Sequence, residues 1–145
     1  MRKLLFFVGL IIVSCSSDDN SPSNADGELI RNNENLTGNW IIKGGTINGG
    51  EFQTYENDCA TLEDYQQFLA NGDLNFIGHD DSCEVAEFET SKWSISGNNL
   101  IIDNPAPIND YSYEIESLTS EKMILVMTNN SPEGVFTQKS HFERQ

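Results

Sequence analysis

The feature that most constrains the fold is a repeated alternation of apolar and polar residues with a period of two. Tyr111, Tyr113 and Ile115 alternate with polar residues, and other apolar pairs share one face in the same way. This period places one face of a strand on a core and the other in water, which is typical of antiparallel sheets. Candidate strands are residues 38–46, 62–70, 73–79, 86–96, 99–103, 110–117, 122–128 and 135–143.

Turn-forming residues separate these segments, and no long helical pattern interrupts them. Asn71-Gly72 lies between two apolar runs and takes positive φ at little cost, so it predicts a tight hairpin turn. Short strands joined by hairpins predict an all-β fold, a single antiparallel up-and-down β-barrel of about eight strands, because closure removes the sheet edges. Phe88 and Trp93 differ in parity, which predicts a bulge near Thr90-Ser91.

The charge of the chain restricts its partners. The 145 residues suffice for one domain and carry a formal net charge of −15, which argues against nucleic-acid binding. No Lys or Arg lies between Lys43 and Lys92, although that stretch is rich in Asp and Glu. We interpret it as a solvated face, with a calcium or cationic-partner surface as the alternative. It lacks the Asp-x-Asp-x-Asp-Gly order of a calcium loop, so no metal site is predicted.

The N-terminus has the pattern of an export signal. Residues 1–14 start with two basic residues and continue as an apolar run that is short for a bilayer span, which predicts a signal peptide. The run ends in Ile12-Val13-Ser14-Cys15, which resembles a bacterial lipobox and implies lipidation of Cys15. An ordinary cleaved signal with a chance cysteine is the alternative. Residues 15–35 are interpreted as the lipidated cysteine and a flexible tether, because residues 16–27 are rich in Ser, Asn and Asp. Within this range, Leu29-Ile30 could instead start a short strand or pack against the domain.

Several motifs of the remaining chain occur together in a known family. They are Leu36–Trp40, Phe68–Gly72, Cys83, Ser91–Leu100 and Tyr113–Thr119. In this order they resemble the lipocalin-like domain of small Bacteroidetes lipoproteins, across roughly residues 36–143. The resemblance implies a β-barrel domain, here assigned to residues 36–145, carried on a lipid anchor in the outer membrane. It implies no catalytic residue and no common ligand.

The acidic pair Asp18-Asp19 bears on the location. It resembles the export signal of surface lipoproteins in Bacteroidetes, and a plain soluble linker explains it equally well. The predicted location is therefore the cell envelope, with exposure on the cell surface left open.

Cys59 and Cys83 stand outside the two arms of the hairpin centred on Asn71-Gly72. A disulfide between them would clamp the open end of the hairpin, and it fits an envelope location, where disulfides persist. The third cysteine, Cys15, is accounted for by lipidation. Two free thiols or a metal pair are the alternatives, but neither cysteine has a second one nearby, as zinc sites require.

The aromatic residues divide between core and pocket. The interior of an eight-stranded barrel is either filled by side chains or holds one small ligand. The resemblance implies that Trp40, in the Gly-x-Trp opening, closes the bottom of the barrel. Loops 44–58 and 77–85 are expected to frame the opposite mouth. The expected structural core consists of Trp40, Phe68, Phe76, Trp93 and Tyr113.

No pattern of catalytic residues is present, so we expect a protein that is not an enzyme and has no cofactor. His79-Asp80-Asp81-Ser82 is explained by a polar loop, because catalytic triads are assembled in space and not by adjacency. His141 is expected to be a wall residue of the last strand. The expected function is binding of a small apolar or amphipathic molecule. The alternative is a non-enzymatic interaction module that docks its acidic face on an envelope protein. An open apolar cavity favours the first, and a filled barrel with a large exposed patch favours the second.

Overall fold

The computed structural model describes residues 27–132 and 134–145, so the predicted signal peptide, Cys15 and Asp18-Asp19 lie outside the described residues. One short helix, α1 (Asn33–Leu36), precedes the strands. The strands are β1 (Gly38–Ile47), β2 (Gln53–Thr54), β3 (Tyr65–Phe68), β4 (Asp73–His79), β5 (Val85–Ser96), β6 (Asn99–Asp103), β7 (Tyr111–Leu118), β8 (Lys122–Ser131) and β9 (Gly134–Arg144).

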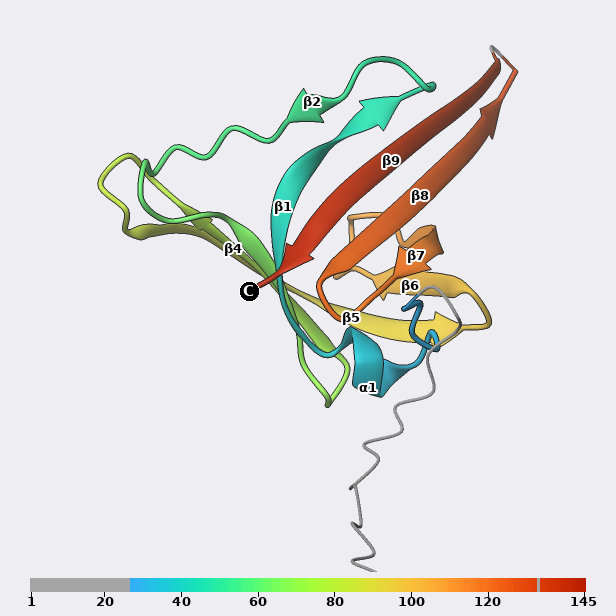
Figure 1. The fold of residues 1–145 in the computed structure, drawn as a ribbon, viewed down its shortest axis with the longest axis horizontal. Coiled ribbons are helices and arrows are strands. Elements are labelled where there is room, and N and C mark those ends of the chain that lie inside the picture. The colour runs from blue at the N-terminus through green and yellow to red at the C-terminus, as the bar shows by residue number, and fades with distance from the viewer. Residues whose placement is uncertain (1–26, 133) are drawn as a thin grey trace, which may run out of the picture.

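The strands form one closed antiparallel barrel (Figure 1). Each strand from β3 to β8 pairs with the next, and β1 pairs with both β3 and β9, which closes the sheet. The short strand β2 pairs with β1 beyond the end of β3, at Gly44 and Gly45. The prediction of an all-β up-and-down barrel of about eight strands is confirmed, with β2 as an addition to it.

Most strand boundaries lie close to the predicted ones, and β3 differs most. Residues 69–72 form the tight turn, with the Leu69 amide bonded to the Asp73 carbonyl, so the strand ends at Phe68. Before the strand, the amides of Thr61 and Leu62 donate to the Cys59 sulfur and not to a neighbouring strand. Local bonds at both ends therefore shorten a segment that the apolar pattern extends to residues 62–70.

The prediction of a bulge near Thr90-Ser91 is wrong. Pairing between β4 and β5 is continuous from residues 73–78 to residues 92–87, and the register shifts only at Ala86. The different parity of Phe88 and Trp93 implies a bulge only if every inward position of β5 is apolar. The inward positions before Trp93 are instead occupied by Ser91 and Glu89, which line a hollow and need no apolar side chain.

The core fills one part of the barrel. Trp40 and Phe68 are fully buried and Trp93 is nearly so, and the rings of Phe68 and Trp93 meet edge to face at 5.3 Å. Tyr113 is partly buried against this cluster. Phe76 is half-buried and lies outside the cluster, because the interior is not filled at its position on β4.

The segment before β1 lies against the barrel, as the alternative for Leu29-Ile30 allowed, and the Leu29 amide donates to the Leu118 carbonyl. Asn32 caps α1 by accepting a hydrogen bond from the Asn35 amide at 2.8 Å, and Leu36 is fully buried. The Glu28 carboxylate accepts hydrogen bonds from the Ser117 hydroxyl and the Leu118 amide. These contacts fix residues 28–36 on the barrel wall next to the core.

Candidate functional site

A hollow lies inside the barrel where the core ends, and we call it the inner hollow. Its volume is about 180 Å³. Its walls come from strands β3 to β7, whose inward side chains continue the same faces that bury the core. Leu74 and Phe76, for example, alternate along β4 and so point to one side. The lining residues are Gln66, Leu74, Phe76, Glu89, Ser91, Ile102, Asn104, Tyr111 and Tyr113.

The floor and two sides of the inner hollow are apolar or aromatic. Leu74 and Ile102 belong to the core cluster and form the floor. The rings of Tyr111 and Tyr113 lie 6.3 Å apart at an interplanar angle of 48°. Burial, and to a lesser extent the neighbouring Tyr111, raise the pKa of Tyr113. Its phenol therefore stays uncharged at neutral pH.

The polar groups of the inner hollow are few, and some are already paired. The Ser91 hydroxyl donates to Asn104 Oδ1 at 2.7 Å, and Asn104 Nδ2 donates to the Asn109 carbonyl at 2.8 Å. Gln66 Oε1 is buried without a hydrogen-bond partner. None of the ion pairs found among the described residues involves Glu89.

A second hollow of about 250 Å³ lies along β1, β2 and β9. Gly45 is opposite Ser140 in this wall, and a Cβ on Gly45 would lie 2.1 Å from the Lys139 carbonyl oxygen. The close approach of β9 thus excludes a side chain at this position. Ile47, at the upper end of β1, also lines this hollow and is half exposed. Part of the predicted mouth segment 44–58 therefore does line a hollow.

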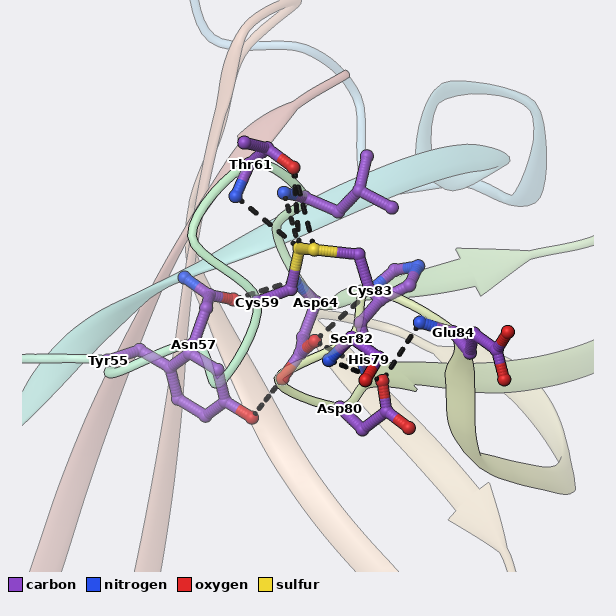
Figure 2. A network of polar contacts seen from close by, with 11 residues as sticks. Tyr55, Asn57, Cys59, Thr61, Asp64, His79, Asp80, Ser82, Cys83 and Glu84 are labelled. Atoms are coloured by element: carbon purple, nitrogen blue, oxygen red, sulfur yellow. Dashed lines mark hydrogen bonds and ion pairs between the residues drawn. A yellow bond between two sulfur atoms is a disulfide. The ribbon is translucent and has the colours of Figure 1, made fainter.

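The other predicted mouth segment, 77–85, forms a polar network instead (Figure 2). At its centre is Asp64, a buried carboxylate that accepts hydrogen bonds from the Tyr55 hydroxyl at 2.7 Å and the His79 amide at 2.9 Å. The Nδ1 of His79 lies 3.3 Å from the same carboxylate. The Asp64 amide in turn donates to Asn57 at 2.7 Å. The network ties the segment after β2 to the end of β4.

Cys59 and Cys83 form a disulfide beside this network (Figure 2), with their Cα atoms 4.9 Å apart. The turn that carries Cys83 is held by Asp80, whose Oδ1 accepts from the amides of Ser82 and Glu84. The Asp80 side chain thus bonds to the backbone of its own loop, and the His79 ring faces the Asp64 carboxylate. This arrangement matches the interpretation of residues 79–82 as a polar loop.

One further residue of the sequence-based predictions can be placed. His141 lies in β9, half-buried, and its ring meets Phe52 edge to face at 5.2 Å. Within residues 27–132 and 134–145, no group of three or more His, Cys, Asp or Glu side chains is arranged to hold a metal ion. In that same part of the chain, no helix has the length and apolar character needed to cross a membrane.

Sequence reasoning missed the polar residues of the inner hollow: Gln66, Glu89, Ser91 and Asn104. The signal that could have found them is the period of two itself. Counting back in steps of two from Trp93 reaches Ser91 and Glu89, and counting forward from Ile102 reaches Asn104. A polar residue at an inward position marks a place where the core does not close.

One comparison with known proteins, a family model, agrees with this geometry. Comparison with curated proteins and with solved structures found no significant match. A family model described as a lipocalin-like domain matches residues 36–125, from the end of α1 into β8, a shorter range than the resemblance suggested. Lipocalin-like domains are generally non-enzymatic binding proteins, and the barrel fold suggests small-molecule binding. Because the match covers more than half of the chain, this protein belongs to the family of lipocalin-like domains.

Proposed function

We propose that this protein is a lipid-anchored lipocalin-like protein of the cell envelope that binds a small apolar or amphipathic molecule in the inner hollow. The observation that carries the proposal is the hollow itself. It combines an apolar floor, three aromatic rings and a few convergent polar groups, which is the usual composition of a small-molecule site.

The two functions considered from the sequence make different demands on the barrel. An interaction module needs no space inside, and its barrel can be filled throughout. Here the core stops at Leu74 and Ile102, and Phe76 and Tyr111 stand around open space. Open space in a barrel costs packing contacts, so a bound molecule would restore contacts that the protein alone does not make.

The test fills the inner hollow and compares ligand binding. Ser91→Phe places a ring inside the hollow, and Ser94→Phe places the same ring on the outer face of the same strand. Native mass spectrometry of each protein, purified from its own host, shows whether a small molecule is retained. We expect retention by the wild type and by Ser94→Phe, and loss from Ser91→Phe. Equal retention by both variants, or no retained molecule and no binding of an apolar fluorescent probe, would contradict the proposal.

The lipid anchor is supported by the lipobox-like end of the apolar run at Cys15. Acyl chains on this cysteine would insert into a membrane, each buried CH₂ contributing about 0.8 kcal/mol. Cys15→Ser should therefore release the protein from the membrane fraction or block its processing. Fractionation and intact-mass analysis measure both effects. A variant that is processed normally and stays in membranes would show that the cysteine is not the anchor.

A further inference from the structure

The inner hollow carries negative charge and no positive charge. Its nine lining residues include Glu89 and contain no Lys, Arg or His. The nearest cation along the chain, Lys92, alternates away from the hollow and pairs with Asp73 on the outside of the barrel. An anionic ligand, such as a fatty acid, would bring a second carboxylate towards Glu89 without a compensating cation.

Three of the uncharged polar residues of the hollow either direct a donor elsewhere or have an acceptor without a donor. The Ser91 hydroxyl donates its only proton to Asn104 Oδ1, and Asn104 Nδ2 donates to the Asn109 carbonyl. Gln66 Oε1 is a buried acceptor without any donor. A buried acceptor without a donor costs about 1–3 kcal/mol, so a ligand donor that the Gln66 amide turns to meet would recover that free energy.

These acceptors lie in one row across the wall. Gln66 pairs with Phe76, and Phe76 pairs with Glu89, on three neighbouring strands. Directly opposite residues have Cβ atoms about 5 Å apart, so the amide oxygen and the carboxylate flank one aromatic ring. Tyr111 and Tyr113 stand on β7 and line the same hollow. Aromatic faces attract cations.

We propose that the ligand of the inner hollow is a protonated organic amine with an apolar body. Its ammonium group donates to Glu89 and Gln66, and its body lies against Phe76 and the two tyrosines. The inference rests on the proposed function, because it concerns the ligand of the same hollow. It narrows the apolar or amphipathic molecule to a cation and excludes fatty acids.

The test uses three ligands of nearly one shape with different charge. Phenethylamine is a cation at neutral pH, 2-phenylethanol is uncharged and phenylacetate is an anion. Each is titrated into the purified full chain by calorimetry at about 0.15 M salt, where the Debye length is about 8 Å and distant surface charges are screened. Glu89→Gln removes the charge of the hollow. Glu114→Gln is the matched control, because it removes an exposed carboxylate that points outward from β7 between Tyr113 and Ile115.

The expected order of affinity is amine, then alcohol, then carboxylate, with the amine about tenfold or more tighter than the alcohol, as for hydrogen bonds to charged groups. Glu89→Gln should reduce the advantage of the amine over the alcohol to less than about threefold, and Glu114→Gln should leave it unchanged. Equal binding of amine and alcohol by the wild type, or an advantage that survives Glu89→Gln, overturns the choice of an amine and leaves small-molecule binding standing. If none of the three ligands binds and an apolar fluorescent probe does not bind either, the proposed function fails as well.

Discussion

Truncation of Trp40 tests the packing of the closed end of the barrel. The side chain is fully buried in the core cluster, and its Nε1 donates to the Leu36 carbonyl at 2.8 Å. The Arg144 guanidinium lies over the ring at 4.2 Å from the centroid, and its Nη1 donates to the Thr37 carbonyl at 2.8 Å. The indole therefore joins the core, the end of α1 and the last strand at one point.

The expected loss in free energy of unfolding follows from these contacts. Truncation of a large buried aromatic residue to Ala costs about 3–5 kcal/mol. Trp40→Ala should fall in the upper part of that range, because it also leaves the Leu36 carbonyl without its donor and Arg144 without its ring. Trp40→Phe keeps a ring and loses the Nε1 bond, so it should cost about 1–2 kcal/mol.

Urea denaturation measures both variants, and the remaining tryptophan, Trp93, reports unfolding by fluorescence. With a slope of about 2 kcal/mol per M, a loss of about 4 kcal/mol lowers the midpoint by about 2 M. Ser94→Ala on the outer face is the control and should change the free energy of unfolding by less than about 0.5 kcal/mol. A loss below about 1 kcal/mol for Trp40→Ala would show that Trp40 does not pack in the core and that the register of β1 is wrong.

Two more predictions concern the disulfide and Glu28. Replacing Cys59 and Cys83 together by Ser should lower the free energy of unfolding by about 3 kcal/mol in the chain-entropy model, and peptide mapping that finds both thiols free in envelope-purified protein would refute the bridge. The Ser117 hydroxyl, the Leu118 amide and Arg31 lower the pKa of Glu28, with the Ser117 bond as the largest cause. A lowered pKa contributes stability that is present above the ordinary value near 4.5 and is lost as pH falls through the folded value. Melting temperatures of Glu28→Gln and wild type should therefore converge progressively as the pH falls below 4.5, and a constant difference between pH 3 and 7 would contradict this.

The fold was more predictable than the site, for a physical reason. Strands with one face in water, such as β7, show a period of two that any reading of the sequence detects. Turn residues such as Asn71-Gly72 then fix the connections, and β4 and β6 begin and end where predicted. Barrel closure follows because unpaired edges are unfavourable.

The inner hollow could not be predicted in the same way. Sequence patterns predict a core from apolar residues, whereas the hollow is defined by inward polar residues such as Glu89 and Ser91. At outward positions the same residue types are simply exposed to water and indicate no hollow. Whether a polar residue points inward or outward depends on the register of its strand. That register depends on the bulges at Lys43, Ala86 and Glu116. A bulge moves every later side chain to the other face and leaves little trace in composition.

The pairing of β1 with β9 also sets the order in which the protein can fold. Trp40 lies opposite Arg144, so the pairing of β1 with β9, the seam of the barrel, joins segments about a hundred residues apart. At a synthesis rate of about 5–20 residues per second, β1 waits roughly 5–20 s for its partner. Until then the chain has two unpaired edges and cannot complete the barrel, whatever local hairpins have formed. The seam therefore makes barrel closure a step that follows synthesis.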